Sequence, residues 1–243
     1  MTLLEVREVA VRFGGLMALQ GVSLDVAPGV VTGLIGPNGA GKTTLFNTIT
    51  GLQPPSSGQV RFNNRDVSNF APHKRARLGI ARTFQRLELF ASLTVQENIE
   101  CALSMSARYR KRTESPGAAT QRLLTRVGLS HVAHVLAGSL PTGQGRVVEL
   151  ARALATEPSV ILLDEPASGQ DDTDTAHFAD LLREMASDGM AVLLVEHDMD
   201  LVMSVCDQIY VLDFGRILAT GTADEIRTNQ TVLDAYLGAG FAA

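Results

Sequence analysis

A glycine-rich segment carries the clearest chemical signal in the chain. It fits the phosphate-binding pattern G-x-x-x-x-G-K-[ST], and its residues are Gly36, Pro37, Asn38, Gly39, Ala40, Gly41, Lys42 and Thr43, followed by Thr44. The glycines let backbone N–H groups surround phosphate oxygens, while Lys42 reaches the β and γ oxygens and the Thr43 hydroxyl binds Mg²⁺. An ordinary glycine turn is disfavoured because apolar residues 30–35 precede the segment and residues 42–49 can form a helix whose N-terminal dipole attracts an anion. The segment therefore predicts a nucleoside triphosphate site.

Two adjacent carboxylates, Asp164 and Glu165, follow the aliphatic run of residues 160–163, which is typical of a buried strand. A carboxylate at the end of such a strand can hold Mg²⁺ directly or through water, so Asp164 is a candidate metal ligand. Glu165 can orient and deprotonate the water that attacks the γ-phosphate, an effect worth about 10²–10⁴-fold, and we predict that it is the general base. An isolated acidic pair after a strand is usually part of a solvated turn. The presence of the phosphate-binding segment in the same chain favours a catalytic role for this pair instead.

Two further polar residues stand at predicted strand ends, although neither is specific alone. His197 follows the strand expected over residues 191–195, where a neutral imidazole could reach the γ-phosphate and fix the attacking water. Gln85 ends the strand expected over residues 80–84, and its amide oxygen could bind Mg²⁺ or water. Both residues are candidates for the same site, and a loop histidine is the more frequent interpretation of His197 by itself.

The elements that must position these residues alternate along the chain. Residues 160–163, a helix over about 173–187 and residues 191–195 repeat the order strand, helix, strand, which implies a mostly parallel sheet with helices on both faces. Residues 3–35 instead read as short strands and turns, which predicts antiparallel pieces beside the nucleotide strand. A hairpin around 213–216 and a capped helix opening at Thr222 follow near the end.

A helical region is expected between the strands at 80–84 and 160–163. Thr94 and Glu97 spell a capping box that opens a helix towards Arg108, a second helix covers about 118–127, and a helical period returns from Gly145 to Leu154. We predict one domain spanning 1–243. Residues 1–85 and 155–243 would form the nucleotide-binding core with a β subdomain, and residues 86–154 would form the helical subdomain.

Composition restricts the remaining functions. The net charge of −5 lacks the basic field that nucleic-acid binding usually requires, so we predict no nucleic-acid partner. Cys101 and Cys206 have no C-x-x-C metal spacing and are expected to be buried and reduced. The N-terminus has no signal-peptide core, and no uncharged apolar run reaches about 18 residues. We therefore expect a cytoplasmic protein that reaches a membrane only through a partner.

In their order along the chain, these motifs resemble those of the ATP-binding cassette (ABC) family over essentially the whole length. Residues 36–43 match its Walker A motif, 160–165 its Walker B motif, Gln85 its Q-loop and His197 its switch histidine. Residues 168–171, which end at Asp171, look like its D-loop, and Leu140-Pro141-Thr142-Gly143-Gln144 stands where its LSGGQ signature belongs. Phe13 occupies the position of the aromatic residue that stacks on adenine, although packing in the core explains a phenylalanine equally well.

The resemblance implies a P-loop NTPase fold, ATP and Mg²⁺ as ligands, and a head-to-tail dimer with a second ABC ATPase subunit, identical or related. The signature residues Thr142, Gly143 and Gln144 of one subunit would close over the ATP of the other, with the helix that starts near Gly145 directing its N-terminus at the γ-phosphate. Pro141 replaces the serine of the signature. Thr142 could supply a substitute hydroxyl, and our hypothesis is that hydrolysis survives.

A finer resemblance points to the ATPase subunits of branched-chain amino acid importers. It is carried by Arg82-Thr83-Phe84-Gln85, by Glu196-His197-Asp198-Met199 and by the ending Asp234-Ala235-Tyr236-Leu237-Gly238. It implies two transmembrane permease subunits, an indirect link to a substrate-binding protein, and a position on the cytoplasmic face of the membrane. Residues 86–90 would then receive a helix of the membrane subunit, or Leu89 and Phe90 would pack the chain's own core.

Three alternatives remain open from the sequence. The first is an ATPase subunit of a related importer, one that carries urea, amides or other hydrophobic amino acids. A soluble cassette protein of DNA repair or translation usually has two cassettes or long inserts, and the acidity of this chain disfavours a nucleic-acid surface. A small-molecule P-loop kinase would leave Gly143, Gln144, Asp171 and His197 without a role.

Overall fold

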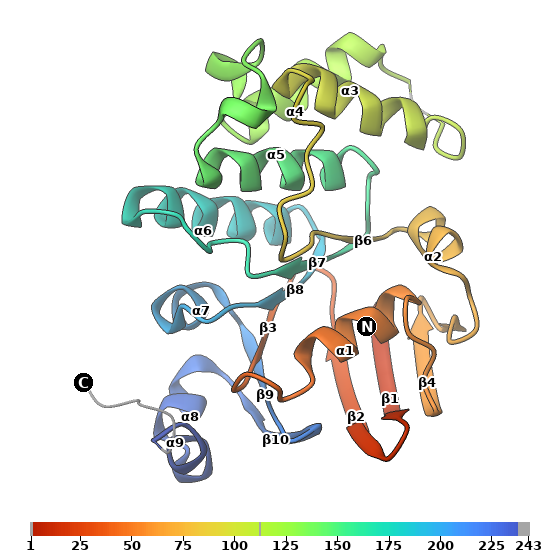
Figure 1. The fold of residues 1–243 in the computed structure, drawn as a ribbon, viewed down its shortest axis with the longest axis vertical. Helices are drawn as coiled ribbons and strands as arrows, with labels where there is room; N and C mark the ends of the chain where they lie inside the picture. Colours follow the sequence, from red (N-terminus) through yellow and green to blue (C-terminus); the bar gives the residue numbers. More distant parts are fainter. Residues whose placement is uncertain (1, 112, 238–243) are drawn as a thin grey trace.

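The computed structural model describes residues 2–111 and 113–237, and within them two β-sheets and a group of helices form the fold (Figure 1). The larger sheet has six strands in the order β10-β9-β3-β8-β7-β6. Its strands are β3 (Val31–Ile35), β6 (Ile80–Arg82), β7 (Val160–Asp164), β8 (Ala191–Val195), β9 (Gln208–Asp213) and β10 (Arg216–Gly221). All neighbours pair in parallel except β9 and β10, which form an antiparallel hairpin. The mostly parallel core sheet predicted from the sequence is confirmed.

The smaller sheet is antiparallel and has the order β2-β1-β4-β5. Its strands are β1 (Leu4–Phe13), β2 (Leu16–Val26), β4 (Ser57–Phe62) and β5 (Arg65–Asp66). Helix α1 (Lys42–Thr50) places Leu45, Phe46 and Ile49 in one core with residues of both sheets. The N-terminus of α1 is thereby fixed at the edge of the parallel sheet.

Alternate residues of the buried strands face two different cores. Val160 and Leu162 of β7 pack with α1, whereas Ile161 and Leu163 pack with the helices on the opposite face. All five residues of β7 are buried, which explains why the strand is an unbroken aliphatic run that ends in a carboxylate. β6 ends at Arg82, two residues earlier than predicted, so Thr83 and Phe84 belong to the connection that leads to Gln85.

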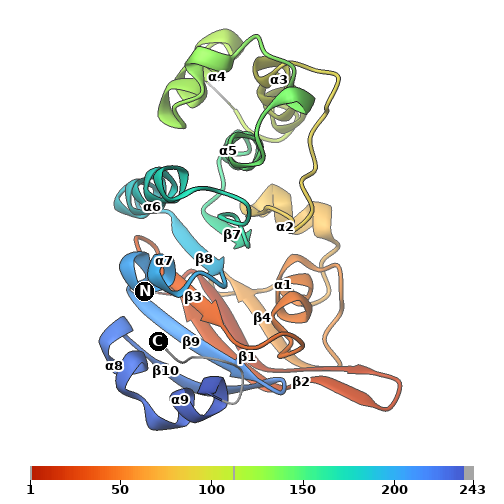
Figure 2. The ribbon, with the colours of Figure 1, turned by 60° about the vertical axis from the view of Figure 1, so that its left-hand side comes forward.

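Three helices between β6 and β7 form a group at the top of Figures 1 and 2, away from β1 and β2. They are α3 (Val95–Ser106), which opens with the predicted capping box at Thr94, α4 (Pro116–Arg126) and α5 (Thr142–Leu154). Short 3₁₀ turns cover Ser130–Val132 and Ala137–Ser139. The expected start of α5 near Gly145 is wrong. The helix begins at Thr142, because the carbonyl oxygen of Pro141 at the N-cap position accepts the N–H of Gly145 at 3.0 Å and closes the first turn.

The remaining helices are α2 (Pro72–Leu78), α6 (Asp172–Ser187), α7 (Met199–Val205), α8 (Ala223–Thr228) and α9 (Gln230–Leu237). Gly238, the last residue of the ending that resembles the importer ATPases, lies outside the described residues. Among the described residues no helix has the length and apolar content that a membrane span needs. Both cysteines are free, and the prediction that both are buried holds for Cys206 but not for Cys101, which is only half-buried.

Candidate nucleotide-binding site

The carboxyl ends of β3, β8, β7 and β6 meet at one edge of the sheet and open into a cavity of about 620 Å³. Ligands of open α/β sheets bind outside this edge. The cavity is lined by most of the predicted site residues, namely Phe13, Asn38, Gly39, Ala40, Gly41, Lys42, Thr43, Thr44, Gln85, Asp164, Glu165 and His197. Residues far apart in the sequence are therefore assembled as one site.

The phosphate-binding loop has a shape that only glycine permits at two positions. A Cβ at Gly36 would lie 2.0 Å from the Leu212 carbonyl oxygen, and one at Gly41 would lie 2.8 Å from the Ala18 carbonyl oxygen. Gly41 is also the N-cap of α1, with φ of 112°, and no side chain caps the helix there. The first N–H groups of α1 are thus left to a ligand, and the chemistry of a nucleotide phosphate fits this cradle.

Lys42 crosses the loop as a buried ammonium. Its Nζ donates to the carbonyl oxygen of Gly36 at 2.6 Å and to that of Pro37 at 3.1 Å. Burial lowers the pKa of Lys42, and the nearby charges of Glu165 and Asp164 oppose this shift. Gly36 and Pro37 thus serve the site through Lys42, and an anion in the cavity would compensate its buried charge.

Glu165 is held by both of the other predicted catalytic residues. Its Oε1 lies 2.8 Å from Nε2 of His197, and its Oε2 accepts a hydrogen bond of 2.9 Å from Nε2 of Gln85. Glu165 also has a positive φ of 50°, which is unusual for a residue with a long side chain and is found most often at functional sites. Two residues that follow β6 and β8 therefore converge on the carboxylate that follows β7.

The neighbouring carboxylate, Asp164, contacts a residue whose role the sequence did not reveal. Arg82 Nη2 donates to Asp164 Oδ2 at 2.8 Å, and both side chains are almost fully buried. Arg82 had been noted only within the motif that resembles the importer ATPases. A charged residue inside an otherwise apolar strand was the available signal, because a buried arginine requires an anionic partner.

Glu196 is a second residue that the sequence did not single out. This buried carboxylate accepts the N–H groups of Ala167 at 2.7 Å and His197 at 2.9 Å. Burial raises the pKa of Glu196, while the backbone N–H groups that it accepts lower it. Glu196 therefore ties the segment after β7 to the segment after β8, and so fixes Glu165 and His197 relative to each other.

The residues of the signature and the D-loop do not line this cavity. Thr142, Gly143 and Gln144 open α5, and Asp171 caps α6 by accepting the N–H of Asp174 at 2.8 Å. A Cβ at Gly143 would lie 2.6 Å from Asp174, so the two helix starts are in close contact. Such a position is the one expected if these residues serve the nucleotide of a second subunit.

Phe13 is 48% exposed and lines the cavity, so the interpretation of this residue as a core phenylalanine is wrong. Its stacking on adenine stays a prediction. The predicted Mg²⁺ ligands Thr43, Gln85 and Asp164 all line the cavity. No cluster of three or more His, Cys, Asp or Glu side chains that could hold a metal occurs in the described part of the chain. The donor set fits Mg²⁺, which is usually held by one or two carboxylates together with substrate phosphates.

The fold and this cavity define a P-loop nucleoside triphosphatase. Residues 19–168 match the family model described as ABC transporter, and residues 216–242 match the model described as branched-chain amino acid ATP-binding cassette transporter. The chain belongs to the ABC transporter family, as one of its ATP-hydrolysing subunits.

Relatives resemble the chain over nearly its full length. The high-affinity branched-chain amino acid transport ATP-binding protein BraF of Pseudomonas aeruginosa is 40% identical, over 97% of this chain and 98% of its own. The ADP conformation of MJ1267, an ATP-binding cassette of an ABC transporter, has a TM-score of 0.87 and 33% identity, over 98% of this chain and 99% of that one. The cassette MJ0796 was solved as a dimer bound to ADP and Pi; it has a TM-score of 0.80 and 27% identity, over 90% of this chain and 98% of that one.

Proposed function

We propose that this chain is the ATPase subunit of an importer for branched-chain amino acids. In this assembly two cassettes would bind ATP between them and drive two permease subunits that receive substrate from a binding protein. The similarity to BraF and the match of residues 216–242 support the substrate class. The observation that carries the proposed chemistry is the Glu165 carboxylate, held between Gln85 and His197 beside the phosphate-binding loop.

The proposed roles follow from the geometry. Lys42 and the N–H groups at the start of α1 hold the phosphates, and Thr43, Asp164 and Gln85 hold Mg²⁺, which supplies charge stabilisation to the transferring phosphoryl group when bound. Glu165 accepts the proton of the attacking water, and His197 keeps Glu165 and that water in position. Because Gln85 and His197 each bind one oxygen of Glu165, the carboxylate has one defined orientation.

Replacing Glu165 with Gln tests this function directly. Glu165→Gln should lower kcat for ATP hydrolysis about 10²–10⁴-fold, because the amide cannot accept the proton, and should leave ATP binding intact. Phosphate release by the complete transporter measures the rate, and calorimetry measures binding. Glu184→Gln, a carboxylate on α6 outside the cavity, is the matched control and should hydrolyse ATP normally. Hydrolysis by Glu165→Gln at the wild-type rate would remove Glu165 from this role.

The substrate class needs a separate test. A host strain that lacks the gene for this chain should take up labelled leucine, isoleucine and valine slowly, and the wild-type gene should restore uptake whereas Glu165→Gln should not. Restored uptake of urea or short amides, with no change for the three amino acids, would contradict the proposed substrate and leave the ATPase assignment intact.

The membrane subunit has a candidate docking site on the helical side of the chain. A groove of about 340 Å³ is lined by apolar side chains that are 36–67% exposed, namely Phe84, Phe90, Met105 and Tyr109. Leu89 is instead half-buried and packs on the helical core. Leu89 thus fits the interpretation as a core residue, whereas exposed Phe90 fits the interpretation as a docking residue. We propose that Phe90, rather than Leu89, contacts the permease.

A further inference from the structure

Arg82 reaches the candidate metal ligand from the neighbouring strand. β6 and β7 are parallel neighbours in which Arg82 pairs with Leu162, so the Arg82 side chain lies beside the carboxyl end of β7. There Nη2 donates to Asp164 Oδ2 at 2.8 Å, with the two side chains 6% and 5% exposed. A charge pair this deeply buried leaves little room for either group to be replaced by water.

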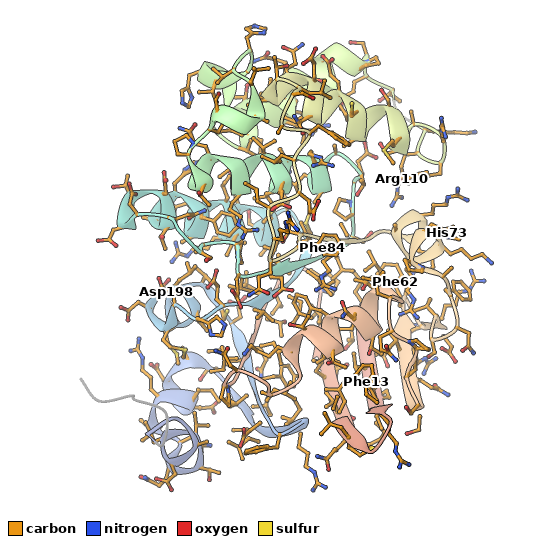
Figure 3. The ribbon with its side chains drawn as sticks, in the orientation of Figure 1. Phe13, Phe62, His73, Phe84, Arg110 and Asp198 are labelled. Atoms are coloured by element: carbon orange, nitrogen blue, oxygen red, sulfur yellow. The ribbon has the colours of Figure 1, made fainter. Side chains whose placement is uncertain are left out.

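The guanidinium of Arg82 is fixed from other sides as well. Its Nη1 donates to Asn47 Oδ1 on α1 at 2.6 Å. Its carbon centre lies 5.3 Å from the centroid of the Phe46 ring and 5.0 Å from that of Phe84. Figure 3 places Phe84 next to the central sheet, where the chain leaves β6 for the helices. The planar donors of Arg82 are therefore held in one orientation by a hydrogen bond and two aromatic rings.

We propose that Arg82 is the positioning residue for Asp164, holding Oδ2 so that Oδ1 is presented to Mg²⁺ in the nucleotide cavity. This inference rests on the proposed metal role of Asp164. Asp164 lines the cavity, and a carboxylate with one oxygen bound to a fixed donor can offer only the other oxygen to a metal in a defined direction. Partners that orient a metal ligand typically change metal affinity by about 10–100-fold.

The same contact joins the metal ligand to the Q-loop. Phe84, which covers the Arg82 guanidinium, directly precedes Gln85, and Asn47, which binds its other nitrogen, belongs to the helix that follows the phosphate-binding loop. Arg82 thus connects α1, the Q-loop and Asp164. A lysine at this position carries the charge but has no fork of donors that spans Asn47 and Asp164.

The test uses the full chain with the Glu165→Gln substitution, which blocks hydrolysis, and measures ATP binding by calorimetry in EDTA and over a Mg²⁺ series. In Arg82→Lys, the Mg²⁺ concentration that gives half of the Mg²⁺-dependent gain in ATP affinity should rise about 10–100-fold. Asn47→Ala, which removes one anchor of Arg82 and leaves the ion pair, should raise it less. Binding in EDTA should stay within about twofold of the parent, and exposed Arg183→Lys on α6 should change neither value.

Several results would overturn the inference. An unchanged or lower Mg²⁺ requirement in a folded Arg82→Lys would do so, as would an equal loss of ATP binding in EDTA and in Mg²⁺, which indicates a purely structural role. If Arg82→Lys does not fold, an unchanged Mg²⁺ requirement in Asn47→Ala overturns it. After such a result, Asp164→Asn shows whether the metal role of Asp164 fails or only the positioning role of Arg82. If Asp164→Asn binds MgATP as tightly as its parent, the metal role of Asp164 fails. If Asp164→Asn binds MgATP more weakly, only the role of Arg82 fails.

Discussion

At the scale of single residues, the site contains carboxylates in contrasting environments. Glu165 and Asp164 line the cavity and are held by side chains, whereas Glu196 is buried outside the cavity lining and is held by backbone N–H groups. The contrast separates groups that can meet a ligand from one that only fixes the loops. It also gives Glu196 a pH dependence of its own.

Burial raises the pKa of Glu196 above its ordinary value of 4.5, so the folded state binds this proton more tightly than the unfolded state. The contribution of Glu196 to stability is therefore complete below about pH 4.5 and is lost as the pH rises through the folded-state pKa. Glu196→Gln mimics the protonated form and lacks this loss. We expect the free energy of unfolding of the wild type, relative to Glu196→Gln, to fall as the pH increases from about 4.5. Urea denaturation of both proteins at a series of pH values measures this difference in the free energy of unfolding. A difference that stays constant with pH would contradict the prediction.

The phosphate-binding loop was predicted from local spacing, whereas the roles of Arg82 and Glu196 depend on partners that are distant in the sequence. Gly36 to Thr44 form one continuous segment with a fixed pattern, so local spacing was sufficient to predict the loop. Arg82 meets Asp164 across 82 positions, and Glu196 meets Ala167 across 29. Those pairs depend on which strands are neighbours in the sheet, which periodicity does not reveal.

At the scale of elements, strands and capped helices were predicted well because apolar runs and capping boxes are local signals. Helix α2 was not predicted, because its buried residue is Arg75, which donates at 2.7 Å to the carbonyl oxygens of both Thr48 and Ile49 at the end of α1. A helix held by hydrogen bonds from one arginine has no apolar period to detect. The limits of the helical subdomain, 86–154, stay a prediction.

Helix α5 holds the Q-loop through a buried ion pair. Arg146 donates to the carbonyl oxygens of Phe84 and Gln85 and lies 3.2 Å from Glu149, which in turn accepts the N–H of Glu88 at 3.0 Å. Burial raises the pKa of Glu149. Helix α5 is thereby fastened to the segment that carries Gln85, a proposed catalytic residue.

Arg146→Met should lower the free energy of unfolding by about 3–5 kcal/mol, because it leaves Glu149 buried without its partner. The exposed pair of Arg183 and Asp180 on α6 has the same three-residue spacing, with side chains that are 49% and 78% exposed. Arg183→Met should therefore cost no more than about 1 kcal/mol. Chemical denaturation of both variants makes the comparison. Equal losses would show that burial of the Arg146 pair does not decide its contribution.

At the scale of the whole molecule, the residues proposed to form the two halves of a nucleotide site lie in different places on the chain. The phosphate-binding loop opens into the cavity, while Thr142, Gly143 and Gln144 lie outside it at the start of α5. Thr142 is exposed, and Pro141 beside it has no side chain that can cap the helix start. A second copy or a related subunit is needed to bring the halves together, as in the proposed dimer.

This separation predicts that signature variants affect dimer formation and leave nucleotide binding by the single chain unchanged. With Glu165→Gln as background, Thr142→Ala should weaken the dimer that forms with MgATP by about tenfold or more per site, because a hydroxyl bound to a charged phosphate contributes about 1.5–3 kcal/mol. Thr142→Ser keeps the hydroxyl and should retain the dimer. Sedimentation measures dimer formation and calorimetry measures ATP affinity. If Thr142→Ala forms the dimer as well as its parent, the hydroxyl does not replace the serine that Pro141 displaces, and the backbone of Gly143 and Gln144 must suffice.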